Sequence, residues 1–182
     1  GDRGQRRAPG PTPATPVGVG RYARHVSRSV YLTAVGPSSG KSLVALGLVE
    51  LLSRRVSRLG FFRPVIRSTP DNDIELIRER YQLPDDRIGH AYVADELRTL
   101  VSRSRDVADA AMTHAVTAFM ELESRCDMVV IEGTDFTEAS SPLEFDLNAR
   151  VARHCGAPVL AVINGHDHTV SEILERVRMS EE

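Results

Sequence analysis

The sequence predicts an α/β fold built on a mostly parallel sheet, because short apolar runs alternate with segments of helical spacing. Parallel strands are covered on both faces, so they read as continuous apolar runs such as DMVVIE at 127–132 and VLAVI at 159–163. The chain has 182 residues, which fits one domain with a real core, and the hydrophobic fraction of 41% is ordinary for a globular protein. No apolar run approaches the roughly 18–20 residues of a membrane span. There is no secretory signal pattern either, so we expect a cytoplasmic protein without membrane contact.

Each strand and helix follows from a local pattern in the chain. The apolar and β-branched runs that predict strands lie at 30–35, 59–66, 88–93, 127–132 and 159–163. The segments with helical spacing lie at 40–55, 73–81, 106–125, 145–155 and 169–179. Asp71 and Thr169 precede two of these segments as possible helix caps. Within the second strand we expect Pro64 to end regular pairing, because proline has no backbone N–H to donate.

The stretch GPSSGKS at 36–42 joins the first strand to the first helix and ends as a phosphate-binding loop does. Backbone N–H groups at a helix start bind anions, a lysine contacts the outer phosphates, and a serine hydroxyl binds Mg²⁺. The first glycine of the full pattern would fall at Val35, and Gly36 comes one residue late. Lys41 is the only lysine in an arginine-rich chain, which favours a specific use of its compact ammonium. The alternative is a glycine-rich turn with a solvated lysine.

The carboxyl ends of parallel strands are where ligands bind, and two further polar groups follow strands there. Glu132 ends an apolar strand, where packing does not explain an acid, and Asp73 follows the second strand. Both could hold Mg²⁺, although Asp73 fits a helix cap equally well. Arg63 could grip a phosphate or form a structural ion pair. The expected phosphate-binding residues are Gly36, Ser38, Ser39, Gly40, Lys41, Ser42 and Arg63, and the expected metal ligands are Ser42, Asp73 and Glu132.

The remaining polar features point to no further chemistry. Six arginines and one acid give residues 1–29 a charge of +5, which leaves −7 for the rest of a chain whose net charge is −2. Residues 1–28 are rich in Pro, Gly and Thr without apolar periodicity, so we expect a disordered leader or linker, and we favour that over nucleic-acid binding. Cys126 and Cys155 are expected to be free thiols. The sequence NGHDH at 164–168 is too unspecific to predict a metal site, and we expect no catalytic residue.

Five blocks of sequence carry a family resemblance over about residues 29–179. They are VYLTAVGPSSGKSLVALGLVELL, GFFRPV, PDND, DMVVIEGTDF and LNARVARHCGAPVLAVINGHDHT. In order and spacing they resemble the N-terminal domain of long-form bacterial phosphate acetyltransferase, which is itself similar to dethiobiotin synthetase. The resemblance implies a P-loop NTPase-like three-layer fold over residues 29–182. It also implies that the strands completing such a domain would follow residue 182, so we expect an incomplete domain truncated at its C-terminus.

The resemblance implies regulation and assembly for this domain, with the chemistry elsewhere. Conversion of acetyl-CoA and phosphate to acetyl phosphate and CoA belongs to a C-terminal acetyltransferase domain of that family. The N-terminal domain is associated with a small-molecule effector or nucleotide and with a homo-oligomer. In dethiobiotin synthetase the matching loop binds ATP, and residues matching Ser42, Asp73 and Glu132 bind Mg²⁺. The alternatives are an independent Mg-ATP-dependent ligase of that type, which Arg63 in place of the synthetase lysine puts in doubt, and a non-catalytic nucleotide-binding scaffold.

Overall fold

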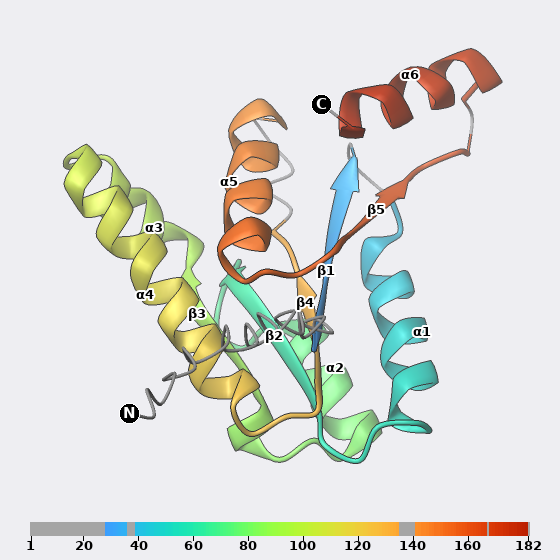
Figure 1. Ribbon diagram of the computed structural model, residues 1–182. Coiled ribbons are helices and arrows are strands. Elements are labelled where there is room, and N and C mark those ends of the chain that lie inside the picture. The colour runs from blue at the N-terminus through green and yellow to red at the C-terminus, as the bar shows by residue number, and fades with distance from the viewer. Residues whose placement is uncertain (1–27, 36–38, 135–140, 167, 182) are drawn as a thin grey trace, which may run out of the picture.

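The structure is a computed structural model that describes residues 28–35, 39–134, 141–166 and 168–181. Its five strands form one sheet in the order β3-β2-β4-β1-β5, and every neighbouring pair is parallel (Figure 1). The strands are β1 (Ser29–Val35), β2 (Leu59–Ile66), β3 (Ile88–Val93), β4 (Met128–Glu132) and β5 (Val159–Ile163). The α/β fold with a parallel sheet, predicted from the apolar runs, is therefore confirmed.

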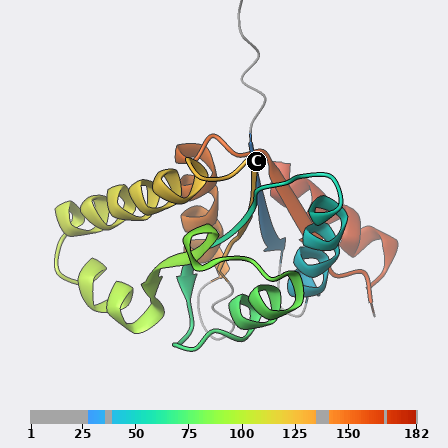
Figure 2. The same ribbon diagram turned by 90° about the horizontal axis from the view of Figure 1, so that it is seen from below.

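Helices cover both faces of this sheet. They are α1 (Lys41–Ser53), α2 (Asn72–Tyr81), α3 (Ala94–Val101), α4 (Arg105–Glu123), α5 (Ser141–His154) and α6 (Val170–Glu181), with a short 3₁₀ turn η1 (Asp85–Arg87). Figure 2 shows α1 and α2 on one side of the sheet and α3 and α4 on the other. Among the described helices, none is both long and apolar enough to cross a membrane.

Two hydrophobic cores result, because successive side chains of a strand point to opposite faces. Leu32 and Val130 belong to the core beneath α1 and α2, whereas their neighbours Tyr31 and Ile131 belong to the core beneath α4 and α5. All of these side chains are 0% exposed. The central strands β1, β2 and β4 are therefore buried on both faces, as their continuous apolar runs predict.

The structure corrects the expected elements at three points. The helix α3 was not predicted. Pairing of β2 stops before Pro64 only on the side of β4, since on the side of β3 it continues to Ile66. The strand β5 was expected to be buried, but Val159 and Leu160 are 54% and 42% exposed, because β5 lies at the edge of the sheet and pairs with β1 alone among the described strands.

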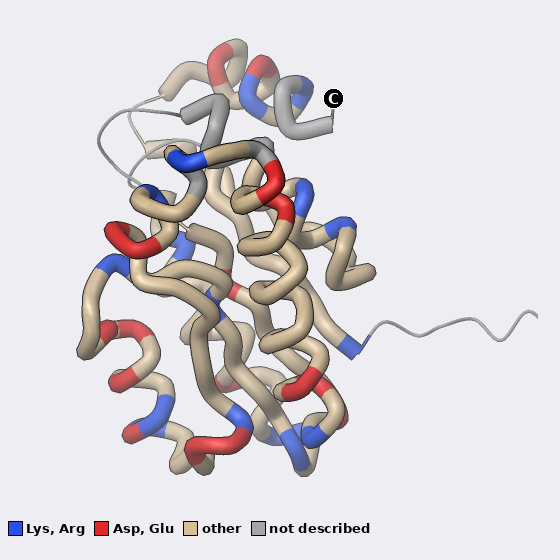
Figure 3. The backbone as a smooth tube through the Cα atoms, turned by 90° about the vertical axis from the view of Figure 1, so that its left-hand side faces the viewer, with Lys and Arg blue, Asp and Glu red and all other residues tan. Residues whose placement is uncertain are grey.

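The charged residues lie mainly on helices and connecting loops, as the coloured tube in Figure 3 shows. Arg63 on β2 and Glu132 on β4 are the only Lys, Arg, Asp or Glu residues on the five described strands. A charge inside a sheet covered by helices is rare unless it is paired or functional. These two residues therefore mark the part of the sheet that differs from its apolar surroundings.

Candidate functional site

The start of α1 is built as an anion site. Gly40 precedes the helix with φ of +77°, a left-handed conformation that favours glycine. Gly40 at the N-cap position has no side chain to cap the helix, and the first turn of α1 contains no acidic residue of its own, so backbone N–H groups at this end can bind an anion. Ser39 Oγ accepts a weak hydrogen bond of 3.3 Å from the backbone N–H of Lys41. Gly36 and Ser38, also predicted to bind phosphate, lie outside the described residues.

Lys41 is turned toward the sheet and is 2% exposed. Its ammonium donates to the carbonyl oxygen of Gly133 and lies 3.9 Å from Glu132 Oε1. This contact exists because β4 is the direct neighbour of β1, with Leu32 opposite Glu132 in the register. The expectation that Glu132 faces the end of the first loop, which depended on those strands being neighbours, is therefore met in the structure.

Ser42 connects the two acids that were expected to bind metal. Its hydroxyl oxygen lies 3.1 Å from Asp73 Oδ2 and 3.1 Å from Glu132 Oε1, and it can donate its single proton to one of them at a time. Asp73 does not cap α2, because the capping group is Asp71, whose side chain accepts from the N–H of Ile74 at 3.1 Å. Of the two roles considered for Asp73, the cap is therefore wrong.

Arg63 is held by ion pairs. Its Nη1 lies 2.6 and 2.8 Å from the two oxygens of Asp71 and 3.0 Å from Asp73 Oδ2. Its Nε lies 3.7 Å from Glu132 Oε2. Burial lowers the pKa of Arg63, but the nearby carboxylates outweigh this and the net pKa is raised, so the guanidinium stays charged. Of the two roles that the sequence allows, the structure shows the ion pair, and a phosphate contact stays a prediction.

Burial dominates the electrostatics of Glu132, which is 0% exposed. Desolvation raises the pKa of its carboxyl, and the positive charges of Arg63 and Lys41 oppose that rise. The oxygen Oε2 has no hydrogen-bond partner among the described residues. Burying a carboxylate oxygen without a hydrogen-bond partner costs free energy unless a ligand binds to that oxygen. The position of Oε2 is therefore consistent with a bound ligand.

The oxygens of Ser42, Asp73 and Glu132 fit a magnesium ion. Mg²⁺ is commonly held by one or two carboxylates together with substrate phosphates and water, so two acids and one hydroxyl suffice. The described part of the chain contains no cluster of three or more His, Cys, Asp or Glu residues that could hold a metal. The donor set thus suits an ion that arrives with phosphate better than one bound by protein alone. The histidines of NGHDH join no such cluster, and Asp167 lies outside the described residues.

A depression of about 290 Å³ opens beside this cluster. Its polar lining comes from the end of β2, the loop that follows, the starts of α1 and α2, and the residues just after β4. The polar lining residues are Ser42, Arg63, Arg67, Ser68, Asp71, Asn72, Asp73 and Thr134. The carboxyl ends of three strands therefore surround one open space, which is where a parallel α/β sheet places its ligands.

A hydrogen-bond network that holds the end of β4 was not predicted from the sequence. Asn148 of α5 is 3% exposed, and its Oδ1 accepts from the hydroxyl of Tyr31 at 2.8 Å and from the N–H of Thr134 at 3.0 Å. Gly133 leaves no room for a side chain here, since an added Cβ would lie 2.6 Å from Asn148 Oδ1 and 2.8 Å from the ring of Tyr31. Only a polar residue on a helix that was expected to be amphipathic could have hinted at this contact.

Comparison with known proteins identifies the family. Residues 28–182 match AAA_26, described as an AAA domain. The chain belongs to this family. The sequence is 33% identical to phosphate acetyltransferase of Nitratidesulfovibrio vulgaris over 85% of this chain and 22% of that protein. The corresponding protein of Synechocystis is 29% identical over 85% of this chain and 23% of its own length, and that of Salmonella typhimurium is 22% identical over 85% and 22%.

The AAA_26 match and the names of the relatives confirm the resemblance to the P-loop domain of phosphate acetyltransferases. The chain spans about a fifth of the length of these relatives. Membership of AAA_26 supports a P-loop scaffold that binds nucleotides in general.

Proposed function

We propose that this chain is the regulatory and assembly domain of a phosphate acetyltransferase and that it binds ATP with Mg²⁺ at the start of α1. The observation that carries the proposal is the meeting of Lys41 and Ser42 with Glu132 of the adjacent strand. An uncapped helix start, a lysine, a hydroxyl and a strand-end acid are the parts with which P-loop proteins hold phosphates and a metal ion.

In this proposal each part of the site has one task. Ser39 and Gly40 supply the open helix start, Lys41 turns from Glu132 to the outer phosphates, and Ser42, Asp73 and Glu132 hold the ion. When bound, Mg²⁺ would neutralise charge on the phosphate oxygens. The predictions for Gly36, Ser38 and Arg63 stay part of the proposal.

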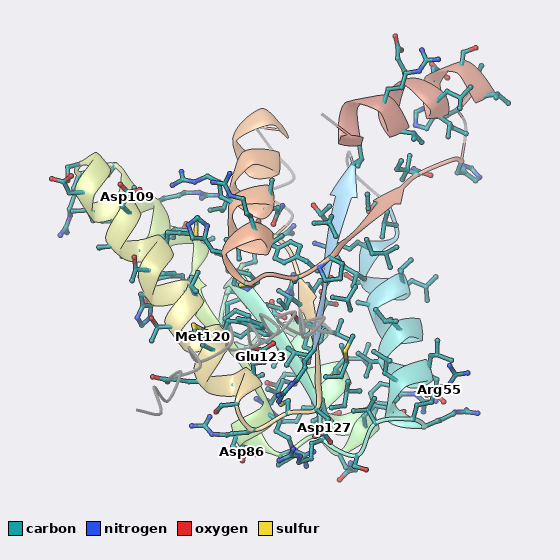
Figure 4. The ribbon with its side chains drawn as sticks, in the orientation of Figure 1. Arg55, Asp86, Asp109, Met120, Glu123 and Asp127 are labelled. Atoms are coloured by element: carbon teal, nitrogen blue, oxygen red, sulfur yellow. The ribbon has the colours of Figure 1, made fainter. Side chains whose placement is uncertain are left out.

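Calorimetric titration with Mg-ATP tests the site. The wild-type chain should bind, and Lys41→Ala should lose at least about tenfold in affinity, because a charge-assisted contact to phosphate is removed. Arg55→Ala is the matched control, since Arg55 lies just beyond the opposite end of α1, at the lower end of the molecule in Figure 4. Absence of ATP binding to the wild-type chain would remove both this proposal and the ligase alternative.

Acetyl transfer is assigned to the rest of the longer protein. We therefore expect no release of CoA when this chain is mixed with acetyl-CoA and phosphate, because the described site residues include no thiol and the carboxylates of Asp73 and Glu132 are paired with Arg63 and Lys41. Sustained turnover of acetyl-CoA by the purified chain would contradict the regulatory role directly.

Assembly into a homo-oligomer is supported by apolar side chains at one edge of the sheet. Val159 and Leu160 on β5 are 54% and 42% exposed, and Val170 and Leu174 on α6 are 73% and 51% exposed. Exposed apolar groups that gather in one region are typical of contact surfaces. Light scattering should show a particle larger than one chain, and Leu160→Lys should reduce its mass, whereas Leu43→Lys on the exposed side of α1 should not.

The domain layout and location belong to the same proposal. We place a leader or linker at residues 1–28 and the P-loop domain at 29–182, so a chain that begins at residue 29 should keep the urea midpoint and nucleotide affinity of the full chain.

A cytoplasmic location is supported by the two free thiols, Cys126 and Cys155, since free cysteines are the norm in reducing compartments.

A further inference from the structure

Arg63 contacts every carboxylate around the candidate metal position. Its Nη1 lies 3.0 Å from Asp73 Oδ2, the same oxygen that lies 3.1 Å from the Ser42 hydroxyl. Its Nε lies 3.7 Å from Glu132 Oε2. The guanidinium therefore forms ion pairs with both acids that would serve as metal ligands.

Asp71 fixes Arg63 in this position. The Asp71 carboxylate receives two short contacts from Nη1, and it also caps α2. The exposed fractions are 9% for Arg63 and 7% for Asp71, so water screens the pair poorly. Because Asp71 caps α2 and also binds Arg63, the folded chain itself holds the positive charge of Arg63 next to Asp73 and Glu132.

Glu132 has a cation near each of its oxygens. Lys41 lies 3.9 Å from Oε1 and Arg63 lies 3.7 Å from Oε2. Neither Arg63 Nε nor Glu132 Oε2 has a hydrogen-bond partner among the described residues, although both are buried. The charges thus attract each other without a hydrogen bond, which leaves Oε2 able to bind a ligand but only against the repulsion of two nearby positive charges.

We propose that Arg63 is a built-in counter-ion that competes with a divalent cation for Asp73 and Glu132, so that the metal binds together with a polyphosphate and not by itself. Three carboxylates face two protein cations, which leaves one net negative charge for an ion of charge +2. A polyphosphate adds several negative charges and draws Lys41 from Glu132, which favours the ion. This second step rests on the nucleotide binding proposed above, whereas the competition by Arg63 does not.

Titration with Mn²⁺ in the absence of nucleotide, followed by the electron paramagnetic resonance of the free ion, tests the competition. Arg63→Met removes the charge and keeps most of the volume, and it should bind Mn²⁺ at least about tenfold more tightly than the wild-type protein. Arg63→Lys keeps the charge and should bind about as weakly as wild type. Arg58→Met is the matched control, because Arg58 pairs with Asp127 before β4, at the other end of the strands (Figure 4).

Several results would overturn the proposal. One is an Arg63→Met protein that keeps the wild-type circular dichroism spectrum but gains no affinity for Mn²⁺. Another is a gain that survives when Glu132→Gln is added, since the ion would then bind elsewhere. If Arg63→Met does not fold, Mn²⁺ is titrated into the wild-type protein without nucleotide. A site that depends on Glu132 and binds Mn²⁺ alone with a Kd below about 10 μM would refute the competition. A gain in Arg63→Met without any ATP binding by wild type would instead leave the competition standing and reject only the proposed function.

Discussion

The strands β4 and β5 are alike in sequence and opposite in environment. Both are five residues long and apolar, MVVIE and VLAVI. In the structure β4 lies between β1 and β2 and its residues Val129 to Glu132 are buried, whereas β5 lies at the edge with its first two residues exposed. Of these two strands only β4 ends in an acid, and that acid, Glu132, contacts Lys41 and Ser42 at the start of α1. The difference shows that apolar composition predicts a strand but not its place in the sheet.

The largest effect should come from truncating the centre of β4. Ile131→Ala removes a side chain that is 0% exposed in the core beneath α4 and α5, and should lower the free energy of unfolding by about 2–5 kcal/mol. Leu160→Ala on β5 should lower it by less than about 1 kcal/mol, because Leu160 is already 42% exposed. Urea denaturation of both variants checks this. Equal losses would mean that β5 is covered in solution.

The cysteines that precede the two strands should both react slowly. Burial raises the pKa of Cys126, before β4, and raises the pKa of Cys155, before β5, to about 12. A raised pKa leaves Cys155 with far less thiolate at pH 8 than an ordinary cysteine has, so its reaction with a disulfide reagent should be at least about tenfold slower. The release of chromophore over time in native and urea-unfolded protein measures this. Rapid reaction of one thiol in the native state would show that its strand start opens locally.

The carboxyl end of β4 should depend on α5. Asn148→Ala leaves the buried hydroxyl of Tyr31 and the N–H of Thr134 without their acceptor and should lower the free energy of unfolding by about 1–3 kcal/mol. Asn164, after β5, is the matched control, since among the described residues its side chain accepts a local bond from the N–H of His166, and Asn164→Ala should change little. Thermal denaturation of the two variants separates these outcomes, and a smaller loss for Asn148→Ala than for Asn164→Ala would disprove the role of the network.

The smallest effect should come from the exposed pair at the amino end of β4. The hydrogen bond from Arg58 lowers the pKa of Asp127 below its ordinary value of 3.8. A lowered carboxyl pKa stabilises the fold above the ordinary value, and this contribution is lost as the pH falls through the lowered one. Asp127→Asn should therefore reduce the urea midpoint slightly at pH 7, and the difference from wild type should shrink under acid conditions. A difference that grows as the pH falls would contradict this sign.

Much of the fold followed from local patterns. The predicted ranges of β2, β3 and β5 agree with the structure, and Thr169, predicted as a cap, precedes α6 and accepts from the N–H of Glu172 at 3.4 Å. The helix α3 was missed because it has only eight residues and follows β3 directly, without a connecting turn or a capping side chain. The sequence alone could not decide whether Asp71 or Asp73 caps α2, because both acids lie in the same turn before the helix.

The sequence by itself determined the alternation of strands and helices, the lysine and serine at the start of α1 and the acid at the end of an apolar strand, because these depend on neighbours along the chain. Only the tertiary structure decided that β4 lies beside β1, that β5 lies at the edge, and that Arg63 stands against Asp73 and Glu132. Those facts depend on strand order, which places Lys41 beside Glu132, 91 positions along the chain, and pairs Tyr31 with Val159, 128 positions along the chain. Hydrophobic periodicity predicts which side of a helix or strand is buried, but it does not predict which other element will pack against that side.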